Sequence, residues 1–138
     1  MSNRDEIILE KMIQYANEIA YTIQKFNLDY VKFAEDFIVK NAVSMCILQI
    51  GELVNKLSDE FKNIYNALPW KDIKAMRNIA AHNYGEIDLE VLWETIINDV
   101  PDLKEYCQKI ILERYRKRKD WFHCNNSLLW ISNFFIKP

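Results

Sequence analysis

Glycine and proline are so scarce in this chain that they constrain its fold more than any other feature. The 138 residues include two glycines and three prolines, which leaves little material for tight turns. Leucine and isoleucine recur at intervals of three and four positions, the spacing that places side chains on one face of an α-helix. The sequence therefore predicts an all-α protein, an antiparallel bundle of four to five amphipathic helices with short connectors.

Five helical segments are predicted from the apolar spacing and from capping residues. We expect them over about residues 5–26, 29–57, 70–81, 88–100 and 102–115. Asn3 and Glu6 would form a capping box before the first segment, and Asp29 and Asp88 would cap the second and the fourth. Pro101 would stop or kink the chain between the last two. Residues 58–68 would be a connector with room for a short helical turn.

The cysteines and the N-terminus indicate a cytoplasmic protein without a metal or disulfide framework. Cys46, Cys107 and Cys124 are odd in number and form no C-x-x-C pair. We expect free thiols, buried or half-buried, in a reducing compartment. The charged N-terminus lacks the apolar run of a signal peptide. A single domain of this length buries about two-thirds of its unfolded surface, so it can fold without staples or cofactors.

The candidate site is a polar cluster at the end of the helix predicted over residues 70–81. It contains Arg77, Asn78, His82 and Tyr84. Arginine is always charged and forks onto phosphates, histidine titrates near neutral pH, and a carboxamide and a phenol add hydrogen-bonding groups. These groups are suited to handling a phosphodiester.

Helical spacing favours a site shared between two chains. Asn78 and His82 are four residues apart and lie on one helical face, and Arg77 and Tyr84, seven apart, lie on an adjacent one. Arg77 and His82 are about 140° apart around a regular helix, so one chain does not obviously aim both at one phosphate. Either the helix unwinds near His82, as Gly85 permits, or a two-fold dimer forms a composite cleft. We favour the dimer.

The pattern R-N-x-x-x-H-x-Y resembles the signature of the HepT-like branch of the HEPN superfamily, small all-helical toxins described as ribonucleases. The resemblance covers about residues 5–112. It also includes residues 48–52, 68–70, 87–88 and 91–93. It implies a HepT-like HEPN bundle over residues 1–116 and leaves residues 117–138 as a C-terminal extension of uncertain structure.

The site residues and the resemblance together predict metal-independent cleavage of RNA by its own 2′-hydroxyl. His82 would act as general base or acid, Arg77 would neutralise charge on the phosphate, and Asn78 would orient His82 or a phosphate oxygen. Single-stranded RNA is the expected target. Glu52 is a weaker candidate, because a solvated i,i+4 pair with Lys56 is its commonest explanation.

The resemblance also implies a partner. In this family a minimal nucleotidyltransferase antitoxin transfers adenylyl groups from ATP to the tyrosine of the motif, which is Tyr84 here. The added phosphate beside Arg77 and His82 would imitate substrate and block the cleft. The chain would then be the toxin of a type VII toxin-antitoxin pair. The alternative for Tyr84 is a ring packed on the bundle with its hydroxyl in water.

Charge is distributed unevenly along the chain. Residues 1–113 hold 12 basic and 19 acidic groups, and residues 114–138 hold 6 and 1. The basic run at residues 114–119 can bind phosphates or an acidic antitoxin, or it can be a solvated helix end. Residues 120–138 are too apolar for a free tail and too short for a membrane span, so we expect them to pack on the bundle or on a partner chain.

Two other functional classes stay open at the level of sequence. The first is a non-catalytic helical module that uses the same polar cleft to hold a nucleotide or to dock a nucleotidyltransferase. The second is a helical oligomer with a structural role alone, which would give the polar cluster no purpose. Replacing His82 with alanine separates the enzyme from the module, since the enzyme would lose RNA cleavage with dimerisation intact. The structural role would be favoured if Arg77, His82 and Tyr84 could all be replaced without consequence.

Overall fold

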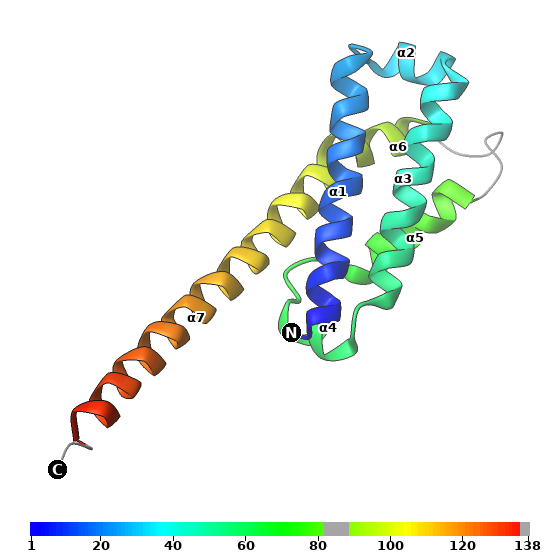
Figure 1. Cartoon of the computed structure of the whole chain (residues 1–138). Helices are drawn as coiled ribbons and strands as arrows, with labels where there is room; N and C mark the ends of the chain where they lie inside the picture. Colours follow the sequence, from blue (N-terminus) through cyan, green and yellow to red (C-terminus); the bar gives the residue numbers. More distant parts are fainter. Residues whose placement is uncertain (82–88, 136–138) are drawn as a thin grey trace.

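The computed structural model describes the backbone of residues 1–81 and 89–135 and the side chains of residues 1–78 and 89–123. All regular structure in these ranges is helical, which confirms the all-α class. The elements are α1 (Asn3–Lys25), α2 (Tyr30–Glu35), α3 (Phe37–Lys56), α4 (Asp59–Ile64), α5 (Trp70–Ala81), α6 (Leu89–Glu94), the π-helix η1 (Thr95–Asp99) and α7 (Val100–Phe135). Helix α1 packs against both α3 and α7, which run opposite to it, and α5 packs across α3 (Figure 1).

The core lies where these helices meet and is built from side chains at helical spacing. Among the described residues, α3 is the one helix long and apolar enough to cross a membrane, but half of that stretch is buried inside the protein. Its position between α1 and α5 is that of a core helix. The largest fully buried side chains include Leu9, Met12, Ile19, Phe33, Ile47, Ile50, Phe61, Leu92, Leu103 and Ile110.

Helix α1 begins at Asn3, two residues before the predicted start. The expected capping box of Asn3 and Glu6 is wrong, because Ser2 is the N-cap and Asp5 completes the box. The Ser2 hydroxyl accepts the Asp5 N–H at 3.1 Å, and the Asp5 carboxylate accepts the Ser2 N–H at 3.2 Å. At the other end Asn27 has φ of 46°, a left-handed conformation that asparagine tolerates, and it ends the helix where expected.

A second aspartate divides the helix predicted over residues 29–57. Asp29 caps α2 as expected. Asp36, however, has an extended conformation and accepts the N–H groups of Ile38 at 2.9 Å and Val39 at 3.2 Å. It is therefore the N-cap of α3, and the expectation of a single helix is wrong because this side chain offers the backbone an alternative to continued helical hydrogen bonding.

Helical structure continues through Pro101, so this proline does not end the helix. The five residues before α7 form a π-helix, in which the N–H of Val100 donates to the carbonyl of Thr95, five residues back. A proline ring meets the carbonyl four residues before it in a regular α-helix, here that of Ile97. The wider π turn spans this position, so the chain continues directly into α7. Asp88, the expected cap of the segment before it, lies outside the described residues.

Helix α7 extends twenty residues beyond the end expected near Tyr115 and projects from the bundle (Figure 1). Two side chains of its basic run are held by the N-terminal end of α1. Arg114 Nε lies 3.1 Å from one carboxylate oxygen of Glu6, and Arg118 lies 2.8 Å from the other. The free basic groups of the described run are thus fewer than the sequence indicates. The domain boundary at residue 116 stays a prediction.

We predict that Asp5 makes stability depend on pH in the acid range. Its carboxylate accepts hydrogen bonds from the Ser58 N–H at 3.0 Å, the Ser58 hydroxyl at 3.0 Å and the Ser2 hydroxyl at 2.8 Å. Burial alone raises the pKa of Asp5, but these hydrogen bonds outweigh it and hold the pKa below its ordinary value. The stabilisation is therefore complete above the unfolded pKa of about 3.9 and is lost as pH falls through the folded pKa.

Asp5→Asn is expected to lower the free energy of unfolding by roughly 2 kcal/mol at pH 7, since hydrogen bonds to a charged acceptor are lost. Urea denaturation at pH 7 and pH 3 measures this, and the difference from the wild type should shrink at the lower pH. Asp59→Asn is the matched control, because Asp59 is exposed in the first turn of α4. An equal difference at both pH values would contradict the assignment to Asp5.

Candidate functional site

Helix α5, which carries the first half of the polar cluster, has the predicted bounds and is anchored at its start. The indole N–H of Trp70 donates to the carbonyl of Tyr65 at 2.6 Å. Trp70, Ile73 and Met76 are buried at three-residue spacing and fix one face of the helix on the core. Arg77 follows directly, at the edge of that buried face, where its side chain is half exposed.

Gly51 allows α5 to lie unusually close to α3 at the level of Arg77. A Cβ atom placed on Gly51 would lie 2.8 Å from the Cβ of Arg77 and 3.0 Å from its backbone nitrogen. Neither atom can move away without shifting the helix. The absent side chain of Gly51 therefore sets the distance between the two helices. The backbone of Arg77 is fixed by this crossing, and only its outer side chain is adjustable.

Glu52 forms an ion pair with Arg77 across the two helices. Its Oε1 lies 2.5 Å from Arg77 Nε, with side-chain exposures of 33% for Glu52 and 48% for Arg77. Glu52 was expected to pair with Lys56 on the same helix. That expectation is wrong, because its carboxylate pairs with Arg77. Glu52 therefore holds the guanidinium at its Nε edge. The structure therefore places Glu52 beside Arg77, where it can orient the guanidinium, and its role in a reaction stays a prediction.

Gly51→Ala is expected to destabilise the protein by about 1–3 kcal/mol, because the added methyl group forces α3 and α5 apart. Alanine gains roughly 1 kcal/mol in helix propensity, so the net loss would be at the lower end of that range. Thermal unfolding monitored by circular dichroism measures the effect. Asn55→Ala, at an exposed position of the same helix, is the control and should not lower the melting temperature. A Gly51→Ala protein as stable as the wild type would contradict the close crossing.

The remaining predicted site residues are placed only in part. Asn78 is exposed on α5, next to Arg77. His82 and Tyr84 lie outside the described residues, as does Gly85. The convergence of Arg77 and His82 on one phosphate therefore stays a prediction.

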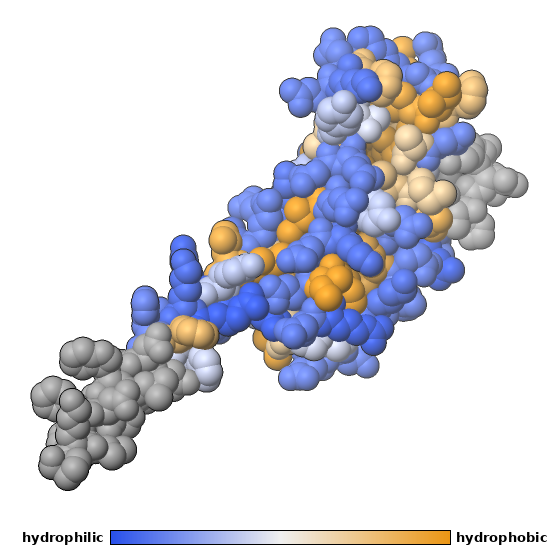
Figure 2. Space-filling model, viewed as in Figure 1, coloured by the Kyte–Doolittle hydropathy of each residue, from blue (hydrophilic) through white to orange (hydrophobic). Residues whose placement is uncertain are grey.

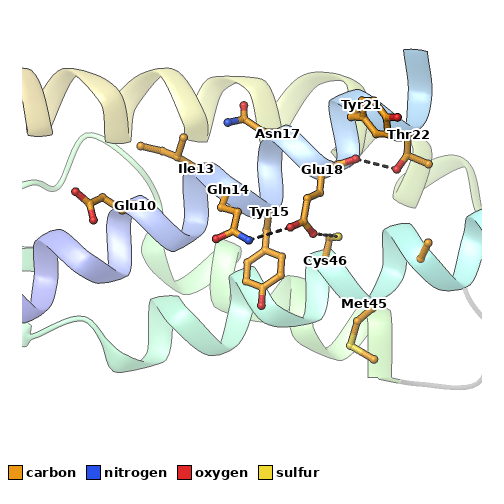
Figure 3. A pocket seen from close by; sticks show the side chains of 11 residues that line it. Glu10, Ile13, Gln14, Tyr15, Asn17, Glu18, Tyr21, Thr22, Met45 and Cys46 are labelled. Atoms are coloured by element: carbon orange, nitrogen blue, oxygen red, sulfur yellow. Dashed lines mark hydrogen bonds between the residues drawn. The ribbon is translucent and has the colours of Figure 1, made fainter. Parts of the chain in front are cut away.

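A groove of about 800 Å³ lies between α1 and α3, away from α5, and its charge is wrong for RNA (Figure 3). Gln14 and Cys46 both point at the carboxylate of Glu18, at 3.0 Å and 3.6 Å. Glu10 adds a second carboxylate, and no lysine or arginine lines the groove. Phosphates would be repelled there, so this groove is not a candidate RNA site.

The described cysteines are free thiols, as the sequence predicts. Burial, assisted by the negative charge of Glu18, raises the pKa of Cys46 to about 11. Burial raises the pKa of Cys107 to about 12. Both thiols are protonated at neutral pH, so neither has the thiolate that nucleophilic chemistry requires. The side chain of Cys124 lies outside the described residues.

Comparison with known proteins places this fold and its Arg77 crossing in a family. A family model described as "Ribonuclease HepT-like" matches residues 12–110. The chain belongs to the HepT-like ribonuclease family. This confirms the resemblance predicted over residues 5–112 and, with the helical architecture, the HEPN-like fold. The match includes Gly51, Glu52 and Arg77 and ends before the basic run of α7.

Relatives from archaea support the HepT-like assignment. The chain is 30% identical over 112 residues to a candidate RNase of Methanocaldococcus jannaschii. The aligned residues cover 80% of this chain and 91% of the relative. A second candidate RNase of that organism is 30% identical over 118 residues, 85% of this chain and all of the relative. A probable ribonuclease HepT of Thermococcus cleftensis is 30% identical over 80 residues, 55% and 73% of the two chains. No solved structure matches the chain.

Proposed function

We propose that this HepT-like protein is a metal-independent RNA endonuclease and the toxin of a type VII toxin-antitoxin pair. The observation that supports this most is the half-exposed guanidinium of Arg77, which an ion pair holds on a backbone fixed between two helices. Gly51 brings its backbone against α3, and Glu52 holds its Nε edge. Such a preorganised cation costs little rearrangement when a phosphate binds. Family membership adds the reaction class, because the matching family is one of ribonucleases.

In the proposed reaction, the 2′-oxygen of a ribose attacks the adjacent phosphorus atom. The bond from phosphorus to the 5′-oxygen of the next nucleotide breaks, which leaves a 2′,3′-cyclic phosphate and a 5′-hydroxyl. His82 accepts the proton of the 2′-hydroxyl or donates one to the leaving 5′-oxygen. The guanidinium of Arg77 stabilises the charge on the pentacoordinate phosphorus, and Asn78 orients a phosphate oxygen or His82.

A homodimer would complete the site, with His82 of one chain and Arg77 of the other acting on one phosphate. A cluster of exposed apolar residues supports an interface between chains, because such surface is stabilised when another protein buries it. They gather at the end of the molecule formed by α2 and the first turns of α3, where Figure 2 shows hydrophobic surface. They are Val31, Phe37, Ile38 and Met45.

Tyr84 is the proposed point of control by a minimal nucleotidyltransferase antitoxin. Its phenolic oxygen would attack the α-phosphorus of ATP, the bond to the β-phosphate would break, and pyrophosphate would leave while the phenol proton passes to a base. The resulting adenylyl-tyrosine carries a phosphodiester close to Arg77 in sequence. Its negative charge would pair with the guanidinium and exclude RNA.

The test is the chemistry of the products. Purified protein is incubated with a single-stranded RNA in the presence of EDTA, and the fragments are examined by mass spectrometry. Fragments with 2′,3′-cyclic phosphate and 5′-hydroxyl ends are expected. Cleavage abolished by EDTA would contradict the metal-independent reaction. Binding of RNA or nucleotide without any cleavage would instead favour a non-catalytic module.

A further inference from the structure

The apolar stripe by which α7 packs on the bundle continues in phase beyond the bundle. Its buried members alternate at intervals of three and four residues, the spacing of a coiled-coil seam. They are Val100, Leu103, Cys107 and Ile110. The same spacing then runs through positions 114 and 117 and reaches a second apolar set. This second set, called here the distal seam, consists of Trp121, Cys124, Leu128, Ile131 and Phe135.

The two apolar sets are separated at the point where α7 leaves its own chain. Arg114 stands at a seam position and binds the end of α1, through Glu6 and through the carbonyls of Met1 and Ser2 at 3.0 Å. Beyond this point α7 projects away from the other helices (Figure 1). Trp121, the first residue of the distal seam, is 63% exposed. The seam thus begins where the described part of the chain offers α7 no further neighbour.

The composition of the projecting segment argues that its helix is held by a partner. Residues 121–135 contain three asparagines, two serines and five aromatic residues and no alanine, glutamate or lysine. Asparagine, serine and aromatic residues are weak helix formers, and isolated helices of about 15 residues are marginal in water even with good ones. The segment is nevertheless helical to Phe135. Burial of an apolar seam is the usual source of such stability.

We propose that the distal seam pairs with the same seam of a second copy of this chain, in an antiparallel arrangement. A two-fold axis beside Leu128 lets one apolar stripe cover its own copy. Charge selects the direction. Lys117 is eleven residues from Leu128, so antiparallel pairing places the two basic runs about 33 Å apart, several times the Debye length of about 8 Å. Parallel pairing would place the two basic runs side by side, where their like charges would repel each other.

A lipid surface fits the same segment less well. Helices that lie on membranes carry lysine and arginine on their polar face. The polar positions between the seam residues carry no lysine, arginine, aspartate or glutamate. They include Asn125, Asn126, Ser127, Ser132 and Asn133. A seam that faces another protein helix needs no such charge. This inference does not depend on the proposed ribonuclease activity.

The mass of the assembly tests the proposal. Full-length wild type is compared by light scattering with the double variant Leu128→Asp and Ile131→Asp, which places two charges on the seam. The matched control, Asn126→Asp with Asn133→Asp, adds the same charges outside the seam. We expect the seam variant to have half the mass of the wild type and the control to keep it. If a separate dimer forms at the motif, the change is from four chains to two; otherwise it is from two to one. Equal masses for all three proteins, together with no cross-link between the two copies of position 128 in the oxidation experiment below, would overturn the proposal.

Disulfide cross-linking tests the direction independently of mass. Antiparallel pairing places the two copies of position 128 together and the two copies of Cys124 about 12 Å apart along the axis, too far for a disulfide. In a Cys46→Ser background, mild oxidation should cross-link Leu128→Cys with Cys124→Ser but leave native Cys124 unlinked. The reverse result would overturn the antiparallel arrangement. A single-chain mass together with flotation on phosphatidylglycerol vesicles would overturn self-association in favour of a membrane.

Discussion

Arg77→Ala is expected to slow RNA cleavage by about 10²–10³-fold, the usual cost of removing one charged stabiliser of a transition state. The fold should survive, because the Arg77 side chain is half exposed and its buried neighbour Met76 is unchanged. The rate constant is measured with a single-stranded RNA under saturating protein. His82→Ala should lose a similar factor. The double variant should be little slower than either single one if the two groups act in the same step.

The controls for this experiment come from the same pair of helices. Lys74→Ala removes an exposed cation from α5 one turn before Arg77 and should leave the rate within a few-fold of wild type. Arg77→Lys keeps the charge but loses the forked donors, so it should recover part of the activity. Glu52→Gln frees the Nε edge and should cost less than Arg77→Ala. An Arg77→Ala protein that cleaves at the wild-type rate would remove Arg77 from the reaction.

Tyr84→Phe is expected to abolish neutralisation by a cognate nucleotidyltransferase while it preserves RNA cleavage. The substitution removes the one atom that can accept an adenylyl group and keeps the aromatic ring. Cells that express the variant together with the antitoxin should stop growing, whereas cells with the wild-type pair should grow. Intact-protein mass spectrometry should show the added adenylate mass on the wild type and none on the variant.

Tyr21→Phe supplies the comparison for the modification, since Tyr21 is an exposed tyrosine on α1, far from the motif in sequence. It should gain adenylate mass and support growth like the wild type. If Tyr84→Phe were still modified and neutralised, another residue would be the acceptor. If the variant were neutralised without gaining mass, the antitoxin would act by binding alone.

The parts of the fold that depend on local sequence could be predicted, and α5 is the clearest case. Its start follows from Pro69 and its amphipathic spacing, and the structure has it from Trp70 to Ala81. Asp36 was not predicted because the apolar period runs through it without a break. It could have been found as a second potential N-cap seven residues after Asp29, since the physical signal is the short side chain rather than the period.

The partner of Glu52 could not be predicted from the spacing of one helix. A carboxylate four residues before Lys56 always has a local explanation, and the competing one requires knowledge of which helix crosses α3. Gly51 was the available signal, because a glycine inside a helix that is otherwise apolar often marks close approach of another backbone. The length of α7 was missed for a related reason. Its last turns have weak helical propensity, so local sequence predicts an end where the chain continues.

The contact between α7 and α1 also determines how much a small tilt of α7 displaces its far end. A single carboxylate, that of Glu6, receives both Arg114 and Arg118 and so helps to set the angle at which α7 departs. Phe135 is twenty-one residues beyond Arg114, a lever arm of about 31 Å. A tilt of roughly 10° about the Arg114–Glu6 contact would move the far end of α7 by about 5 Å, close to the length of one helical turn. Replacement of this one side chain would therefore redirect everything that the projecting helix carries.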